Sequence, residues 1–257
     1  YYASRGLGDV YKRQTEKPHE ITGKLIAGET YTLVETACPD GYAYSESVEF
    51  TVPKENGKTI QVKMEDKPTH VTISKIDITD SKELPGAELV LTDSNGNEVE
   101  RWISGTKPHE IIAKLIAGET YTLSEYKAPD GYGYSENITF TVSKDGSIDK
   151  VIMKDKPTEE VFSKMDITGE KELPGARMQV IDQYGTIVET WISTEAPHKI
   201  TGKLIAGETY ILHEESAPSG YAYSEDIRFT VPKDGKIQKV TMKDKPTHVE
   251  LTKTDIT

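Results

Sequence analysis

The sequence has little of several features that would mark a functional class. It has one cysteine in 257 residues, Cys38, so an intrachain disulfide framework and a cysteine-rich metal site are excluded. Its apolar runs fall far short of the ~18 residues of a membrane-spanning helix, and no secretory signal pattern is visible. Basic residues are outnumbered, 31 to 43, and the formal net charge is −12. This acidity argues against nucleic acid and anionic membrane as partners.

What the chain has in abundance is self-similarity. An octapeptide, Lys-Leu-Ile-Ala-Gly-Glu-Thr-Tyr, occurs at residues 24–31, 114–121 and 203–210. A second motif, Asp-Lys-Pro-Thr, starts at Asp66, Asp155 and Asp244. The offset of 89 to 90 residues is too long for a solenoid repeat and is typical of a chain of small domains.

The repeats divide the chain into five segments. Two are expected to be complete domains, at 69–157 and 158–246. Residues 15–68 match only the rear part of a unit, and residues 247–257 match only the first strand of a further one. Repeat similarity begins abruptly after residue 14. We therefore interpret residues 1–14 as a sequencing-library artefact, with a natural variant loop as the alternative.

Within the first complete unit, β-branched and aromatic residues alternate with polar ones, and turn residues such as Asn95-Gly96 separate these stretches. Strands are expected near 70–78, 87–92, 98–104, 110–115, 119–125, 137–143 and 147–155. About seven short strands in ~90 residues, with no helical stretch, predict an all-β fold of tandem antiparallel β-sandwich domains. The linkers are short and contain proline, so the array is expected to be a semi-rigid rod.

Three ionisable residues of this unit continue the apolar side of a strand. Lys75 follows Val71 and Ile73 at alternate positions, and Glu125 and Asp155 follow apolar residues in the same way. Because side chains alternate faces along a strand, all three should point into a core, where an isolated charge costs several kcal/mol. The same trio recurs in the next unit, at Lys164, Glu214 and Asp244.

A lysine and two acids in a dry interior can react with one another. Desolvation disfavours every charged form, and a neutral lysine amine is a nucleophile. Two adjacent carboxyl groups can share a proton, so the glutamate can polarise the aspartate carbonyl while the amine attacks and water leaves. The alternatives are a buried salt bridge or strand-end side chains that reach solvent. One position departs from the pattern, since Glu160 replaces Val71 in the second unit.

Several motifs together resemble a known family. They are Lys-x-Asp in the first strand, Glu-Leu-Pro-Gly-Ala, Tyr-x-Leu-x-Glu followed by Ala-Pro-x-Gly-Tyr, and a terminal acid. Over residues 15–257 these are similar to Cna B-type, SpaA-like domains, which are Ig-like (prealbumin-like) modules in the stalks of Gram-positive adhesins and pilins. The resemblance implies isopeptide bonds Lys75–Asp155 and Lys164–Asp244, promoted by Glu125 and Glu214. Since the terminal residue is Asp where many members have Asn, the bond should release water.

The first and last segments carry only parts of this trio. Glu35 and Asp66 have no lysine-bearing strand before them, and Lys253 lacks its acids. We therefore expect residues 15–68 to form no cross-linked domain and to be poorly ordered. The repeated His109 and His198 are expected in solvated turns, with no metal and no cofactor.

The leading functional hypothesis is structural: stalk or spacer modules of a cell-surface adhesin or pilin, with no enzyme activity beyond a single intramolecular reaction. One alternative is that the modules themselves bind host matrix protein or glycan. Another is that they are accessory modules of a secreted hydrolase. The expected partners are neighbouring repeats and, through regions outside this chain, host matrix or glycan. The expected location is extracellular, at the bacterial cell wall, without membrane insertion.

Overall fold

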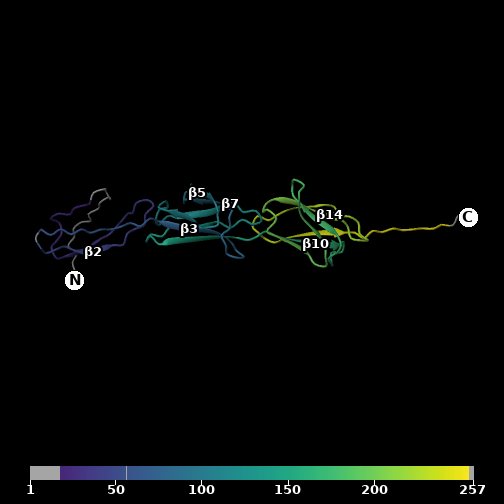
Figure 1. Cartoon of the computed structure of the whole chain (residues 1–257), viewed down its shortest axis with the longest axis horizontal. Coiled ribbons are helices and arrows are strands. Elements are labelled where there is room, and N and C mark those ends of the chain that lie inside the picture. The colour runs from purple at the N-terminus through teal and green to yellow at the C-terminus, as the bar shows by residue number, and fades with distance from the viewer. Residues whose placement is uncertain (1–17, 56, 255–257) are drawn as a thin grey trace.

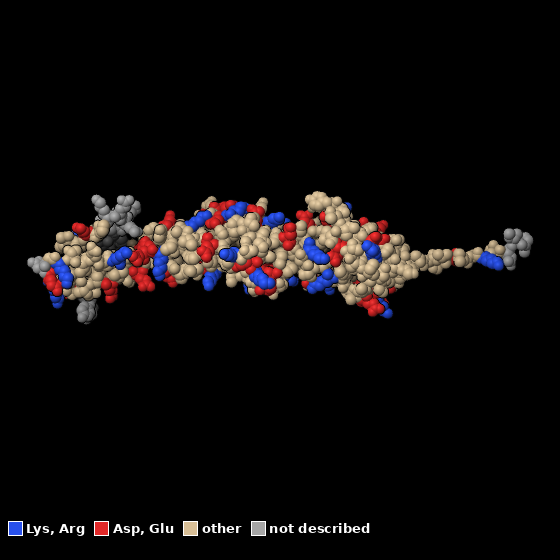
Figure 2. Space-filling view, viewed as in Figure 1, with Lys and Arg blue, Asp and Glu red and all other residues tan. Residues whose placement is uncertain are grey.

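The computed structural model describes residues 18–55 and 57–254. These residues form a rod in which the N-terminal segment, the two complete domains and a short tail follow one another along one axis (Figure 1). Acidic and basic side chains are interspersed along the visible face (Figure 2). Among the described residues, no helix has the length and hydropathy needed to cross a membrane.

The first complete domain is a two-sheet sandwich of seven strands. In chain order they are β3 (His70–Asp77), β4 (Glu88–Thr92), β5 (Glu98–Ile103), β6 (His109–Ile112), β7 (Thr120–Lys127), β8 (Ile138–Thr141) and β9 (Ile148–Asp155). One sheet has the order β6-β3-β9 and the other β5-β4-β7-β8. The predicted all-β sandwich is confirmed, and each expected strand region overlaps one of these strands.

The second complete domain repeats this plan. Its strands are β10 (Glu159–Asp166), β11 (Arg177–Ile181), β12 (Ile187–Ile192), β13 (His198–Thr201), β14 (Thr209–Ser216), β15 (Ile227–Thr230) and β16 (Gln238–Asp244). They form sheets β13-β10-β16 and β12-β11-β14-β15. The inward residues of each strand meet in one apolar core per domain. Leu91 and Leu123 of the first domain, and Val180 and Leu212 of the second, have no exposed surface.

One strand pair in each domain is parallel, which the strand pattern did not predict. β3 lies between β6 and β9 and is parallel to β9, with Lys75 opposite Met153 and Asp77 opposite Asp155. β10 and β16 repeat this arrangement. Because the first and last strands run in the same direction, the chain enters each domain at one end and leaves it at the other. This direction is what makes the array a rod.

The terminal segments have less structure than the two domains. Among residues 18–55 and 57–68 there are two strands, β1 (Thr30–Leu33) and β2 (Val48–Thr51), paired antiparallel. Several apolar side chains of this segment are exposed, including Ile26 at 64% and Val34 at 59%. In the tail, the described residues 247–254 form no strand, and Leu251 is 90% exposed. The expected artefact at residues 1–14 lies outside the described residues.

Candidate cross-link site

The lysine of the first domain lies at the centre of the trio. Lys75 is on β3, the middle strand of its sheet, and is 1% exposed. Its Nζ contacts Asp155 Oδ1 on the neighbouring β9 and lies 2.7 Å from Glu125 Oε1 on β7. The side chains of both acids are fully buried. The fold therefore brings together three groups that are up to 80 residues apart in the sequence.

The second domain has the same constellation. Lys164 Nζ contacts Asp244 Oδ1 and lies 2.8 Å from Glu214 Oε1. Lys164 is 3% exposed, and both acids have fully buried side chains. The trio therefore forms in two cores whose other residues differ.

Strand geometry explains why these side chains meet. In a parallel pair, side chains at adjacent positions of neighbouring strands point to the same face. Lys75 faces inward with its partner Met153, and Asp155 faces inward two residues later on β9. Glu125 comes from the opposite sheet, which packs face to face against the first. The sandwich interior is thus closed around the lysine from two sides.

A serine that the sequence interpretation gave no role completes each site. The Ser135 backbone N–H donates to Glu125 Oε2 at 2.8 Å. The Ser135 hydroxyl lies within hydrogen-bond distance of two acceptors, Asp155 Oδ1 and the Lys154 carbonyl oxygen, the latter at 2.6 Å. Ser224 makes the same three contacts in the second domain. The sequence does mark this serine, since Gly-Tyr-x-Tyr-Ser-Glu occurs at residues 41–46, 131–136 and 220–225. However, a serine in a loop carries no charge pattern that would single it out.

Burial sets the electrostatics of the glutamate. Desolvation raises the pKa of Glu125 to about 7, although Lys75 favours its charged form. A carboxyl group with such a pKa can both take up and release a proton at neutral pH. The second oxygen of Asp155, Oδ2, is buried without a hydrogen-bond partner among the described residues. The proton-sharing contact expected between the two acids is not seen; instead the lysine nitrogen lies next to both.

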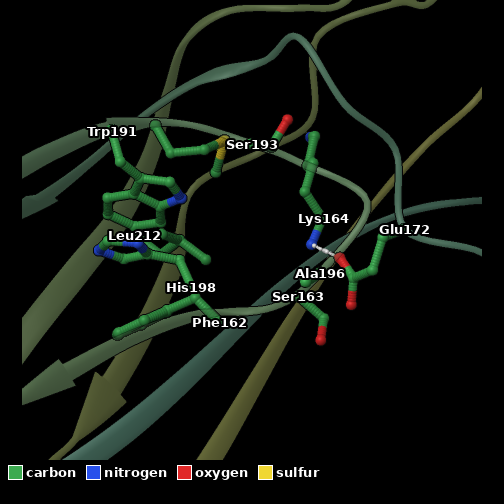
Figure 3. Close-up of a pocket in the computed structure, with 10 residues that line it drawn as sticks. Phe162, Ser163, Lys164, Glu172, Trp191, Ser193, Ala196, His198 and Leu212 are labelled. Atoms are coloured by element: carbon green, nitrogen blue, oxygen red, sulfur yellow. Dashed lines mark hydrogen bonds between the residues drawn. The ribbon is translucent and has the colours of Figure 1, made fainter.

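A cavity next to the lysine differs between the domains. In the first domain it has a volume of about 290 Å³ and is lined by Lys75, Glu83 and Trp102, among others. In the second domain, the matching cavity is about 10 Å³ (Figure 3). Phe162, which replaces Ile73, packs against Trp191 with ring centroids 5.5 Å apart. This larger side chain fills the space.

The repeated histidines are not in solvated turns, so that expectation was wrong. His109 stacks on Trp102 with ring centroids 4.3 Å apart, and His198 stacks on Trp191 at the same distance (Figure 3). His109 Nε2 also lies 2.8 Å from Glu100 Oε1. The histidines begin β6 and β13, where stacking on the tryptophan covers part of the sandwich wall.

A further buried acid lies in the second domain, away from the cross-link trio. Glu160 is fully buried, and neither carboxyl oxygen has a hydrogen-bond partner among the described residues. Desolvation, together with the nearby charge of Glu159, raises the pKa of Glu160 to about 7. The equivalent Val71 of the first domain is also fully buried. Glu160 was expected only to make the strand end less apolar.

The incomplete N-terminal segment keeps the acid half of the site. The Ser45 N–H donates to Glu35 Oε2 at 2.8 Å, and the Ser45 hydroxyl donates to Asp66 Oδ1 at 2.6 Å. The serine and the two acids therefore come together in this segment although it lacks the first strand of a unit. Lys253 lies in the exposed tail. Among the described residues, no cluster of His, Cys, Asp and Glu is suited to hold a metal ion.

Several solved structures are similar to this chain. The Bacillus anthracis TIE protein is 26% identical, over 84% of this chain and 42% of that chain, with a TM-score of 0.43. The shaft pilin SpaA from Lactobacillus rhamnosus GG is 14% identical, over 71% and 99%, with a TM-score of 0.32. The C-terminal fragment of pilus adhesin SpaC from the same organism is 17% identical, over 72% and 99%, with a TM-score of 0.39. These whole-chain likenesses are loose.

The sequence match to a family is much firmer. No curated protein matches the chain. The family model for the SpaA prealbumin-like fold domain matches three times, at residues 9–68, 69–157 and 159–246. The first match begins at residue 9, within the segment interpreted above as an artefact. Since the three matches cover most of the sequence, the chain belongs to the SpaA family of prealbumin-like fold domains.

Proposed function

We propose that this chain is part of the stalk of an extracellular pilin or adhesin, and that each complete domain is closed by an autocatalytic isopeptide bond. The bonds are Lys75–Asp155 and Lys164–Asp244, with Glu125 and Glu214 as promoters. One observation carries the proposal: in both domains a fully buried lysine nitrogen touches the aspartate while the glutamate lies within 2.8 Å.

The reaction is a condensation within the core. Glu125 takes a proton from the Lys75 ammonium, and the free amine attacks the Asp155 carboxyl carbon. Glu125 returns this proton to one Asp155 carboxyl oxygen and carries a second proton from the attacking nitrogen to the same oxygen, which leaves as water. An ammonium and a carboxylate thus become one amide and one water, and Glu125 ends in the protonation state in which it began. Two buried charges disappear, and with them the cost of burying them.

The bond suits a stalk because of where it lies. It joins the first strand to the last, so tension passes from chain entry to chain exit without loading the other strands. By the loop-entropy model used for disulfides, closing a loop of this length stabilises the domain by roughly 4.5 kcal/mol. An amide also resists reduction, which suits a chain with one cysteine. The reaction occurs once per domain, so the chain is not a turnover enzyme.

Intact mass spectrometry tests the proposal directly. The chain should be lighter than its sequence mass by two waters, one for each complete domain. Lys75→Ala should restore one water, whereas Lys154→Ala, which removes an exposed lysine between Met153 and Asp155 on β9, should restore none. An unmodified mass for the parent chain would exclude the bonds.

A further inference from the structure

Consecutive domains are connected by a set of hydrogen bonds at their junction, which is called the joint below. At the junction of the two complete domains, the hydroxyl of the linker residue Thr158 donates to the Leu204 carbonyl oxygen at 2.8 Å. The Gly202 N–H donates to the Thr158 carbonyl oxygen at 2.9 Å, and the Tyr134 N–H donates to the Lys233 carbonyl oxygen at 2.7 Å. The linker and a loop of the first domain are therefore both hydrogen-bonded to the second.

The junction before the first complete domain repeats these contacts. The Thr69 hydroxyl donates to the Leu115 carbonyl oxygen at 2.7 Å, and the Ala113 N–H donates to the Thr69 carbonyl oxygen at 2.9 Å. The Tyr44 N–H donates to the Lys144 carbonyl oxygen at 2.8 Å. Each lysine ammonium also lies over the ring of the tyrosine that it meets, at 5.9 Å here and 5.8 Å in the second joint. The joint is thus a repeated feature.

The two surfaces of the second joint approach so closely that side chains are excluded. A Cβ at Gly131 would collide with the Gly202 carbonyl group, and a Cβ at Gly133 would lie 2.6 Å from Gly235 Cα. These collisions involve backbone atoms, which cannot rotate away. Gly131 has a φ of +83°, which by itself favours glycine, whereas Gly133 is required to be small by the contact between domains. Gly133 has no left-handed φ that would by itself require glycine.

A third copy of the surface that the first complete domain presents to the second is exposed to solvent. It lies at the end of the second domain, where Gly220, Ala222 and Thr247 are all exposed. Their six counterparts in the two joints are buried: Gly41, Ala43, Thr69, Gly131, Gly133 and Thr158. The open copy keeps its own internal geometry, since the Thr247 N–H donates to the Gly220 carbonyl oxygen at 2.8 Å, as Thr158 does to Gly131. Its shape does not depend on an occupant.

Residues 131–134 together with 156–158, and the equivalent residues of the other units, are called the trailing-end surface. We propose that this surface is a docking site for the leading end of a further repeat of the same kind. The leading end consists of residues 202–204 and 233–235 and their equivalents. Docking holds successive domains in one orientation, so the rod is stiff at its joints. The open copy at 220–223 with 245–247 takes the leading end of another such repeat. This inference deepens the proposed stalk function but does not require the cross-links.

The orientation of the two complete domains can be measured in the whole chain. Spin labels are placed at Lys150→Cys and Lys239→Cys, which are equivalent exposed positions on β9 and β16, with Cys38→Ala to remove the native thiol. Pulsed electron resonance then gives the distribution of distances between the labels. The parent should give one narrow distribution. Gly133→Val should broaden it by roughly twofold or more, since domains without a fixed interface move relative to one another.

The open copy supplies the matched control. Ala222→Val makes the equivalent change where no domain follows, so the distribution should stay narrow. Thr158→Val, which removes the hydroxyl bond to Leu204, should broaden the distribution, and Thr247→Val should not. A broad distribution in the parent, or unchanged widths for both Gly133→Val and Thr158→Val, would overturn the proposal. The intact mass of each sample reports the cross-links separately, so the two proposals fail independently.

Discussion

At the scale of single residues, we propose that the glutamate decides whether two neighbouring groups react or remain an ion pair. Lysine and aspartate in contact would ordinarily form a salt bridge, which burial makes costly. In the proposed reaction Glu125 changes this outcome, because desolvation raises its pKa to about 7 and it can accept and return the lysine proton. The chemistry thus depends on a residue that forms no bond in the product.

We expect Glu125→Gln to abolish the bond of the first domain only. The amide has the shape of the acid but cannot exchange the proton. The variant should therefore lack one water instead of two by intact mass, and peptide mapping should find the Lys164–Asp244 linked peptide alone. A deficit of two waters in this variant would show that Glu125 is not the promoter.

Glu160 predicts a pH dependence specific to the second domain. Its folded-state pKa, about 7, lies above the ordinary 4.5, because burial disfavours its charged form. Its contribution to stability is therefore fully present below about pH 4.5 and is lost as the pH rises through 7. The loss is at most about 3 kcal/mol by proton linkage.

Replacement of this acid should remove the dependence. Glu160→Val restores the residue found at position 71, so the second domain should gain stability at pH 8 and little at pH 5. Thermal unfolding of the parent and the variant at both pH values checks this. An equal gain at both pH values would mean that packing, rather than ionisation, accounts for the difference.

At the scale of elements, a loop positions the reacting groups. Ser135 lies between β7 and β8 and bonds to Glu125 from β7 and Asp155 from β9. It therefore ties the two sheets together at the reacting site. Tyr134 beside it is hydrogen-bonded to the next domain, so the loop belongs to the site and to the joint.

Ser135→Ala should slow bond formation in the first domain without unfolding it. The backbone N–H to Glu125 remains, but the hydroxyl bond to the aspartate is lost. A loss of about 1.4 kcal/mol of positioning energy corresponds to roughly a tenfold lower rate. The fraction of Lys75–Asp155 linked peptide, followed over time after induction, measures this. The second domain is the internal control, and Ser224→Ala should reverse the pattern.

At the scale of the whole molecule, the parallel pairing of first and last strands places the points where the chain enters and leaves at opposite ends of each domain. Force enters through β3 and leaves through β9, and the proposed bond joins these two strands. Residues between the linked positions are then shielded from tension. Between the two proposed cross-links, the backbone that is not shielded from tension is the short stretch from Asp155 to Lys164. Most of this stretch belongs to the joint or to β10.

Pulling on single molecules should therefore give very short extensions. In the parent chain, neither complete domain should unfold at forces that open an unlinked sandwich. In Lys75→Ala, the first domain should release the 80 residues between Lys75 and Asp155, or roughly 260–290 Å of contour length at the full reach of the backbone. Two such steps in the parent would contradict the proposed bonds.

The sequence by itself determined the repeats, the strand regions and the candidate trio, because period-2 alternation assigns each side chain to a face of its strand. Lys75, Glu125 and Asp155 were recognisable as charges on an apolar face, and the structure brings them together. Alternation does not report which strands are neighbours, so the parallel β3–β9 pair was not foreseen.

Only the tertiary structure decided the roles of Ser135, of the Trp102–His109 stack and of the joint at Gly133. These depend on contacts between segments far apart in the chain. A serine or a glycine in a loop, or a histidine at the start of a strand, has no periodic pattern to mark it. Its surroundings are set by the packing of the sheets and of the next domain.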